Sequence, residues 1–321
     1  MFSLLPLLLG RAWAHTGAAP TRGVETWDHL PPLDPPDAWI QWEFYPSIVI
    51  GVGLFVVGYI LLAGPLRTRW NLSPVGPKPG EWFRFMFSMF VVFFSLQGPL
   101  HELSDLYLFS GHMVQHLLIT LLFPPMFILG IPAWMWRPLV KHAWVQKVGR
   151  AITHPVVAFV VSTFALYLWH VPTMYDWALA DHNVHIVEHL SFMATAVVMW
   201  WPVWSKIEEI PPLSSGYRMV YLFLLTIPMK GLGALITVSD YLVYRGYATA
   251  PRVFGLDPLV DQRFGGVIMW MPGGLAIWFA MGVVFFTSFY ADMVAGRSGT
   301  KPAPAATDEA VEPSGGVLEG A

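Results

Sequence analysis

Seven long apolar segments follow one another along the chain, separated by short stretches rich in polar residues, proline or glycine. Each is about 17–25 residues long, the length that a helix needs to cross roughly 30 Å of hydrocarbon. Because the connections are short, we expect consecutive helices to pack antiparallel. The pattern predicts an all-α fold, a polytopic membrane bundle of seven transmembrane helices. The segments lie near residues 45–65, 83–100, 107–130, 155–171, 183–204, 217–239 and 265–290.

The composition supports a membrane protein and limits the chemistry that the chain can carry. Of the 321 residues, 55% are hydrophobic and only 12% are charged, whereas a soluble domain carries about 25% charged residues. The net charge of -3 gives no reason to expect a nucleic-acid partner. The absence of cysteine excludes disulfides, iron–sulfur clusters and thiolate ligands. Any metal ion would therefore be held by histidine, methionine or carboxylate side chains.

The two ends of the chain differ from the apolar segments. The N-terminal sequence "MFSLLPLLLGRAWAHTGAAP" resembles a signal peptide that is cleaved after Ala14. The C-terminal residues are rich in proline, alanine, glycine and glutamate, which predicts disorder. We therefore expect a signal peptide over residues 1–14, an extracytoplasmic lead-in over 15–44, a transmembrane domain over 45–292 and a disordered cytoplasmic tail over 293–321.

The distribution of lysine and arginine predicts how the bundle is oriented, because cytoplasmic loops of membrane proteins are enriched in both residues. The mature N-terminal segment and the loops after segments two, four and six hold only Arg22, Arg245, Arg252 and Arg263. The C-terminal tail and the other loops, with the helix starts beside them, hold many more. We expect the N-terminus outside and the C-terminus inside. The basic residues on the inner side are Arg67, Arg69, Lys78, Arg84, Arg137, Lys141, Lys147, Arg150, Lys206, Arg218, Arg297 and Lys301.

Most of the histidines gather at helix ends that this orientation places at the outer face. His112 and His116 are one helical turn apart at the start of the third segment, so they share a helix face. His185 and His189 repeat this spacing at the start of the fifth segment. The outer-face set is His101, in the loop after the second segment, His112, His116, His170, His182, His185 and His189.

These histidines are candidates for a metal site. Neutral imidazole is the commonest protein ligand for metal ions, and histidine together with methionine suits copper. Met113 and Met174 lie near the same depth. A single interfacial histidine more often anchors a helix or bonds a neighbouring helix, so the paired spacing carries the metal hypothesis. Carboxylates placed to orient imidazoles are Glu102, Asp105, Asp181 and Glu188, although Asp181 is also suited to cap the fifth helix.

Features inside the apolar segments predict how the bundle is built. Lys230 lies in the middle of the sixth segment, and a lysine at membrane depth needs a partner. Gly265 and Gly266 in the seventh segment allow close helix approach. Pro124 and Pro125 predict a bend in the third segment.

Four motifs then point to a known family, in the family's own order. With them the chain resembles the integral-membrane CtaG family of cytochrome c oxidase assembly factors over roughly residues 45–290. The resemblance implies a multi-pass protein of the bacterial inner membrane that helps to assemble the haem–copper oxidase by supplying or inserting copper. Its partners would be cytochrome c oxidase subunits and membrane lipid. The motifs are "HMVQHLLITLLFPPMFILGIP", "LWHVPTMYDWAL", "HIVEHLSFMATAVVMWWP" and "DQRFGGVIMWMPGG".

The resemblance also implies which residues matter, and it selects the same outer-face histidines as their spacing does. The family's last motif covers Asp261 and Gly266. A different, single-span copper chaperone has shared the CtaG name, but it relies on cysteines and its mechanism does not apply here. The candidate metal ligands are His101, His112, His116, His170, His185 and His189, with Glu188, Asp261, Met113 and Met174 as accessory residues.

Four other functions fit part of the same pattern. A membrane haem protein would use axial histidines from two helices, such as His116 and His189. A metal-dependent membrane enzyme would add Glu188 and Asp261 to the histidines and keep a coordination position open, although we expect no catalytic role. A permease would need polar groups across the whole membrane, where Lys230 stands almost alone. A scaffold for oxidase subunits would use the histidines only to hold helices together.

Overall fold

The computed structural model describes residues 44–297, and all regular structure within that range is helical. The elements are α3 (Pro46–Ala63), α4 (Pro65–Arg69), α5 (Pro79–Gln97), α6 (Pro99–Leu106), α7 (Phe109–Leu117), the π-helical turn η2 (Leu118–Leu122), α8 (Phe123–Gly130), α9 (Ala133–Val140), α10 (Ala143–Ile152), α11 (Pro155–His170), α12 (Pro172–Ala180), α13 (His182–Trp204), α14 (Ser215–Thr237), the 3-10 turn η3 (Arg245–Tyr247), α15 (Pro258–Val284), the π-helical turn η4 (Phe285–Phe289) and α16 (Tyr290–Arg297).

Five of these helical segments are long and apolar enough to cross a membrane, and two bent pairs raise the number to as many as seven. The bent pairs are α5 with α6, at 44°, and α10 with α11, at 61°. The prediction of an all-α polytopic membrane bundle is confirmed. The five single spans are Pro46–Ala63, Phe109–Gly130, His182–Trp204, Ser215–Thr237 and Pro258–Phe289.

The second span ends differently from the prediction. His101 was expected in a loop, but it lies in helix α6, which continues the span after a bend. The bend falls at Gly98 and Pro99. Gly98 has an extended backbone, and Pro99 occupies the first helical position, where a missing N–H is tolerated. The chain therefore restarts as a helix and places His101 inside the bundle.

The third span contains the irregularity that its two prolines predict. The turn η2 ends at Leu122, two residues before Pro124. Neither proline can donate a backbone hydrogen bond, so carbonyls one turn earlier lose their partners. The carbonyl of Thr120 accepts instead from the indole Nε1 of Trp200 on α13, at 2.9 Å. A side chain from another helix thus stabilises the break.

Small residues allow a close contact between α14 and α15. A Cβ atom added to Gly266 would lie 2.8 Å from the carbonyl oxygen of Gly233, and one added to Gly265 would collide with the ring of Phe109. The predicted close approach at Gly265 and Gly266 is confirmed. Lys230 on α14 finds its partner on α15, because its Nζ atom lies 4.4 Å from the centre of the Trp278 ring.

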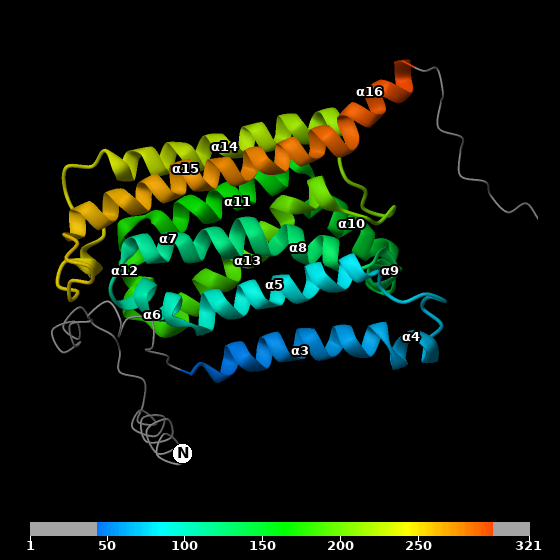
Figure 1. Ribbon diagram of the computed structural model, residues 1–321, viewed down its shortest axis with the longest axis horizontal. Helices are drawn as coiled ribbons and strands as arrows, with labels where there is room; N and C mark the ends of the chain where they lie inside the picture. Colours follow the sequence, from blue (N-terminus) through cyan, green and yellow to red (C-terminus); the bar gives the residue numbers. More distant parts are fainter. Residues whose placement is uncertain (1–43, 298–321) are drawn as a thin grey trace, which may run out of the picture.

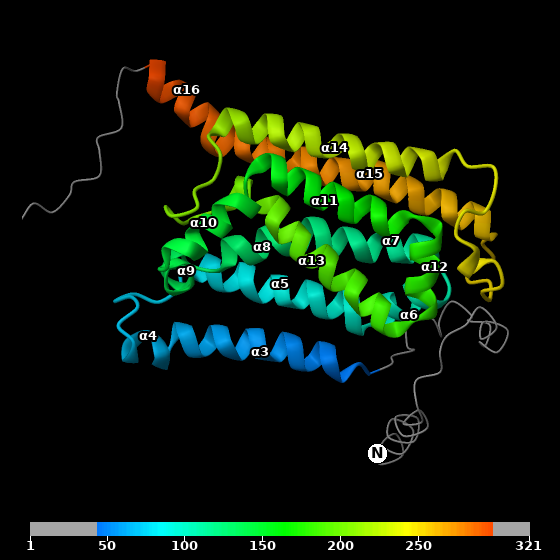
Figure 2. The same cartoon turned by 180° about the vertical axis from the view of Figure 1, so that it is seen from behind.

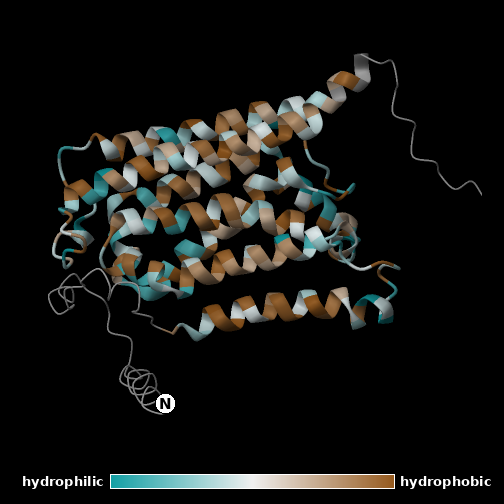
Figure 3. Ribbon diagram, in the orientation of Figure 1, coloured by the Kyte–Doolittle hydropathy of each residue, from teal (hydrophilic) through white to brown (hydrophobic). Residues whose placement is uncertain are grey.

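The helices form a bundle in which α14 and α15 run along one edge and α3 along the opposite edge (Figures 1 and 2). Apolar residues colour the bodies of the helices, and polar residues gather toward both ends (Figure 3). Only 11% of the α3 span is buried inside the protein, compared with 50% of the span Phe109–Gly130. Helix α3 is therefore the least enclosed of the five single spans.

The two ends of the bundle carry different groups. Helices α6 and α12 lie at one end, and α4, α9 and α10 lie at the other (Figure 1). The second end holds the basic residues Arg67, Arg137 and Arg150 of those helices. It also holds an ion pair of 2.9 Å between Lys206 and Glu81. Burial lowers the pKa of Lys206, and this pair opposes the shift. Which side of the membrane each end faces stays a prediction.

Several predicted boundaries fall outside the described residues. These are the signal peptide over 1–14, nearly all of the lead-in over 15–44, and the tail beyond residue 297. The beginning of the tail, predicted as disordered from residue 293, is instead helical, because α16 continues to Arg297. The segment "YADMVAGR" contains no proline, so nothing in it stops the helix that precedes it.

Candidate metal centre

Four helices bring all six predicted histidine ligands to one end of the bundle. His101 comes from α6, His112 and His116 from α7, His170 from α11, and His185 and His189 from α13. Every one of them is buried. Two carboxylates, Asp105 and Glu188, are buried among them. We call these six histidines and two carboxylates the histidine cluster.

Hydrogen bonds fix the starts of the two helices that carry the histidine pairs. The carboxylate of Asp261 on α15 accepts from the backbone N–H of Phe109 at 2.7 Å, and also from the backbone and hydroxyl of Ser110. It thereby anchors the first turn of α7. Asp181 accepts from the backbone N–H of Asn183 at 2.8 Å and caps α13, as the sequence predicts.

The deepest part of the cluster is the Glu188 group, formed by Glu188, His112 and His116. Oε1 of Glu188 lies 3.7 Å from Nε2 of His112 and 3.7 Å from Nε2 of His116. Among the described residues, neither carboxylate oxygen and none of the four ring nitrogens has a hydrogen-bond partner. Leaving such buried atoms unpaired costs about 1–3 kcal/mol each. A cation bound between them would remove that cost.

A second set, the Asp105 group, is formed by Asp105, His112 and His185. Oδ2 of Asp105 lies 3.3 Å from Nδ1 of His185. One potential ligand atom from each of the three residues lies within 4.8 Å of the others, and the same is true of the Glu188 group. The other oxygen of Asp105, Oδ1, lies 3.4 Å from Nδ1 of His101. His112 is the one residue that both groups contain.

The remaining two histidines lie beside these groups. Nε2 of His189 is 3.2 Å from Nε2 of His185. Nδ1 of His170 is 2.7 Å from the backbone oxygen of Leu166. Because a carbonyl oxygen only accepts, Nδ1 carries the proton and Nε2 of His170 keeps a free lone pair. That nitrogen is buried and has no partner in the described range. A backbone carbonyl that orients an imidazole in this way is typical of metal ligands.

Of the four predicted accessory residues, Glu188 belongs to the cluster and the other three make contacts elsewhere. Glu188 lies at the centre of the cluster, whereas Asp261 is engaged at the start of α7. Met113 is buried against Phe109 and Gly265, in the core next to α15. Met174 packs against the apolar cluster that includes Trp169. The structure therefore gives the two methionines packing contacts in the bundle.

Sequence reasoning did not single out Gln115 or Ser104, and it treated Asp105 only as an orienting group. The side-chain oxygen of Gln115 accepts from the hydroxyl of Ser104 at 2.8 Å, and its nitrogen donates to the carbonyl of Ser95 at 2.8 Å. The same nitrogen lies 3.0 Å from Nδ1 of His101. Gln115 lies between the two histidines of α7 in sequence, but only the packing of α6 against α7 shows what it contacts.

Tyrosines cover the cluster on the side of α12. The ring of Tyr175 lies 5.0 Å from the ring of His112. Its hydroxyl is 3.0 Å from that of Tyr247, which donates to the carbonyl of Ser104 at 2.6 Å. Burial raises the pKa of Tyr247 well above its ordinary value. Both tyrosines therefore keep their hydroxyl protons, and their neutral side chains pack over His112.

A cavity of about 310 Å³ lies between α3 and the wall formed by α5, α8 and α13. Most of its lining is apolar, including Val52, Phe55 and Leu190. At its polar end it reaches the cluster. Cavities of this size are typical of small-ligand sites. The cluster residues that line it are His101, His185 and His189.

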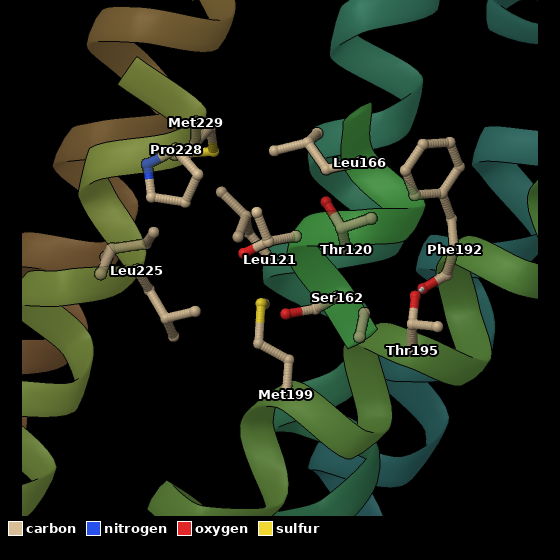
Figure 4. A pocket seen from close by; sticks show the side chains of 13 residues that line it. Thr120, Leu121, Ser162, Leu166, Phe192, Thr195, Met199, Leu225, Pro228 and Met229 are labelled. Atoms are coloured by element: carbon tan, nitrogen blue, oxygen red, sulfur yellow. Dashed lines mark hydrogen bonds between the residues drawn. The ribbon is translucent and has the colours of Figure 1, made fainter. Parts of the chain in front are cut away.

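A smaller cavity of about 60 Å³ lies further along the bundle (Figure 4). Its polar groups are hydroxyls, and three of them bond their own helices: Thr120 to the carbonyl of His116, Ser162 to that of Phe159, and Thr195 to that of Ser191. No charged residue is among its lining residues. The ionisable side chains of the cluster are therefore not followed by others along this cavity.

These features define a polytopic α-helical membrane protein with a buried cluster of imidazoles and carboxylates at one end. The sequence model of the family described as "Cytochrome c oxidase caa3 assembly factor (Caa3_CtaG)" matches residues 57–290. The chain belongs to this family, and the resemblance seen in its motifs is confirmed.

Curated relatives come from mycobacteria. Uncharacterized proteins of Mycobacterium bovis and Mycobacterium tuberculosis are each 23% identical to this chain over 246 residues. One of Mycobacterium leprae is 23% identical over 253 residues. Each match covers 71% of this chain and 36% of the relative, so the chain spans about a third of the length of the curated relatives that it matches. No solved structure matches the chain significantly.

Proposed function

We propose that this protein is a membrane-bound assembly factor for a haem–copper oxidase, and that its histidine cluster holds copper as cargo for an oxidase subunit. Family membership supports the first part. The observation that carries the second part is the Glu188 group, in which two imidazoles and a carboxylate are buried together without hydrogen-bond partners among the described residues.

The donor atoms suit copper. Two ligands about 2.0–2.1 Å from one ion at a tetrahedral angle are about 3.3 Å apart. The 3.7 Å between Oε1 of Glu188 and Nε2 of either His112 or His116 closes to that value with a shift of a few tenths of an ångström. Ring nitrogens and carboxylate oxygens meet in this group without a sulfur atom. Such a donor set favours Cu(II) over Cu(I), which prefers thiolate and thioether ligands.

The position of the cluster suits the transfer of cargo. It lies at the end of the bundle, where a subunit in the same membrane can approach, and a cavity reaches it from the side of α3. Its ligands are imidazoles and carboxylates, which release a metal more readily than thiolates do. An assembly factor needs a site that both binds and releases its ion.

The arrangement of the imidazoles favours a compact ion over a haem. The ring centres of His112 and His116 are 4.1 Å apart, and those of His185 and His189 are 4.3 Å apart. His116 and His189, the pair considered for bis-histidine ligation, have ring centres 5.5 Å apart and are nearly perpendicular. Other imidazoles of the cluster surround both rings, and a porphyrin would need a flat slot between them.

The test is the metal content of the full chain, purified in detergent after growth with copper and measured by mass spectrometry with an optical spectrum. We expect stoichiometric copper in the wild type and its loss in the double variant His112→Gln/His116→Gln. The matched control is His142→Gln/His154→Gln, which removes two exposed histidines from the opposite end and should keep the copper.

Two outcomes would contradict copper handling. A Soret band in the purified protein would favour the haem alternative. Failure to retain copper after loading, with oxidase activity and oxidase copper content in the host unchanged by the His112→Gln/His116→Gln variant, would leave a scaffold for oxidase subunits.

A further inference from the structure

We propose that the histidine cluster is not one metal site but two adjacent sites that share His112, and that metal enters through the Asp105 group and passes to the Glu188 group. This inference rests on the proposed function, since it takes the cluster to hold a metal. It adds the number of ions, their order and the residue that links them.

The separation into two sites follows from the carboxylates. Each site has one carboxylate of its own, Asp105 or Glu188, with an imidazole that the other site does not use. The distance from Asp105 to His185 is 3.3 Å, and that from Glu188 to His116 is 3.7 Å. Both distances are close to what a single bound ion imposes on two ligands. Each carboxylate would offset one positive charge of a divalent ion in a buried setting.

His112 is placed to serve both sites. Its ring is fully buried, and neither nitrogen has a hydrogen-bond partner in the part of the chain that the structure describes. The two nitrogens of an imidazole point in different directions, but only one of them carries a lone pair in the neutral ring. His112 therefore binds one ion as a neutral ligand, and it binds the second as an imidazolate, releasing its remaining ring proton to solvent when that ion arrives. The Nε2 atom faces Glu188, and the ring stacks at 5.8 Å against that of His185 from the Asp105 group.

The order of filling follows from the cavity beside α3. His185 lines this cavity, and so do its neighbours His101 and His189. Asp105, His112, His116 and Glu188 do not belong to the lining residues, so His185 of the Asp105 group is the one lining residue that either group contributes. An ion that arrives through the cavity therefore meets the Asp105 group first. Two cations this close repel strongly where the dielectric constant is low. A second ion in the Asp105 group would thus weaken the hold on the first and favour its release.

The number of sites is tested by titrating the metal-stripped full chain in detergent with Cu(II), followed by mass spectrometry and electron paramagnetic resonance. We expect the wild type to bind two copper ions in two steps. Glu188→Gln and Asp105→Asn should each bind one, with different spectra, because each removes a different site. His112→Gln should weaken both steps. The variant His142→Gln/His154→Gln, at the opposite end, should behave as the wild type.

The route is tested by filling the cavity. Gly51 on α3 lines it, and a Cβ atom added there meets nothing within 4 Å. We expect Gly51→Leu to slow copper loading several-fold while the final stoichiometry stays at two. Gly58, on the same helix, has equally open surroundings but does not line the cavity. Gly58→Leu should load at the wild-type rate.

Each contrary result has a separate meaning. One copper ion in the wild type, lost equally in Glu188→Gln and Asp105→Asn, would overturn the two-site proposal and leave the proposed function standing. Failure of the wild type and of every variant to bind copper would contradict the two-site proposal and the copper-handling function together. Equal loading rates for Gly51→Leu and the wild type would overturn the route. If Asp105→Asn does not fold, as judged by size exclusion, His185→Gln tests the same site and should also bind one ion.

Discussion

Hydrogen bonds from residues outside the histidine cluster orient individual side chains in or beside it. The carbonyl of Leu166 fixes the proton of His170 on Nδ1, which leaves Nε2 as a donor atom. The hydroxyl of Ser104 and the carbonyl of Ser95 fix the amide of Gln115 beside His101. Supporting bonds of this kind define how a ligand points before any ion arrives.

The first prediction at this scale concerns Asp261. Its hydrogen bonds to the first turn of α7 position His112 relative to the cluster. In Asp261→Asn an amide N–H₂ replaces one of the two acceptor oxygens, so the substitution should destabilise the protein by about 1–2 kcal/mol. It should also weaken copper binding without changing the number of ions bound. Thermal unfolding and a copper titration measure the two effects.

The matched control for this substitution is Asp257→Asn on the same helix. Asp257 is exposed and caps α15 through the N–H of Leu259 at 2.9 Å. Asparagine caps helices as well as aspartate does, so the control should have nearly wild-type stability. If Asp261→Asn lost a copper ion at unchanged stability, Asp261 would be a ligand and its positioning role would be wrong.

At the scale of elements, breaks in the helices shape the site as much as the helices do. The bend at Gly98 and Pro99 directs α6 into the bundle and brings His101 and Asp105 to the cluster. The π-helical turn η2 begins two residues after His116 and is bonded to α13 through Trp200. The bend thus places the polar groups of α6 in the cluster, and the bond to Trp200 links the third span to α13 just beyond the histidines of α7.

The prediction at this scale concerns the contact between α14 and α15. A methyl group at Gly266 would be forced against the backbone of Gly233 and Thr237. Gly266→Ala should therefore destabilise the bundle by about 1–3 kcal/mol through overpacking. Gly282→Ala provides the comparison, because a Cβ atom there meets nothing within 4 Å. It should be neutral or stabilising by about 0.5–1 kcal/mol, since alanine favours helices. Equal melting temperatures for the two variants would contradict the packing argument.

For the whole molecule, the separation of the two ends is the dominant feature. The histidine cluster lies at the end of α6 and α12, and the basic helices α4, α9 and α10 lie at the other (Figure 1). The Asp105 group and the Glu188 group draw their residues from α6, α7 and α13, so bound ions would connect α6 and α7 to α13, which is distant from them in sequence. Metal binding should therefore act on the stability of the entire bundle.

The prediction at this scale is a thermal shift. Copper at about 100 times its dissociation constant should stabilise the folded protein by roughly 2.7 kcal/mol, because only the folded state assembles the cluster. The melting temperature of the wild type should rise by a few degrees, and a chelator should reverse the rise. The His112→Gln/His116→Gln variant should show no shift. A similar shift in that variant would place the stabilising copper elsewhere.

The sequence by itself determined the class of structure and the location of the chemistry. Apolar segments of membrane-spanning length have to be helical, because the backbone finds no hydrogen-bond partner in hydrocarbon. The spacing of His112 with His116 and of His185 with His189 then follows from the helical repeat. The close approach at Gly266 and the cap at Asp181 follow from local chemistry in the same way. All of these features depend on residues near one another in the chain.

Only the tertiary structure decided which of these groups meet. Asp261 bonds Phe109 across 152 positions of sequence, and Asp105 faces His185 on another helix. Met113 turns toward α15 although it follows His112 directly. The order of helices around a bundle is set by how their side chains pack against distant partners, and no local pattern encodes it. For that reason the histidines and the candidate carboxylates were predictable from the sequence, whereas the pairing of each carboxylate with particular histidines, the shared position of His112 and the cavity beside α3 were not.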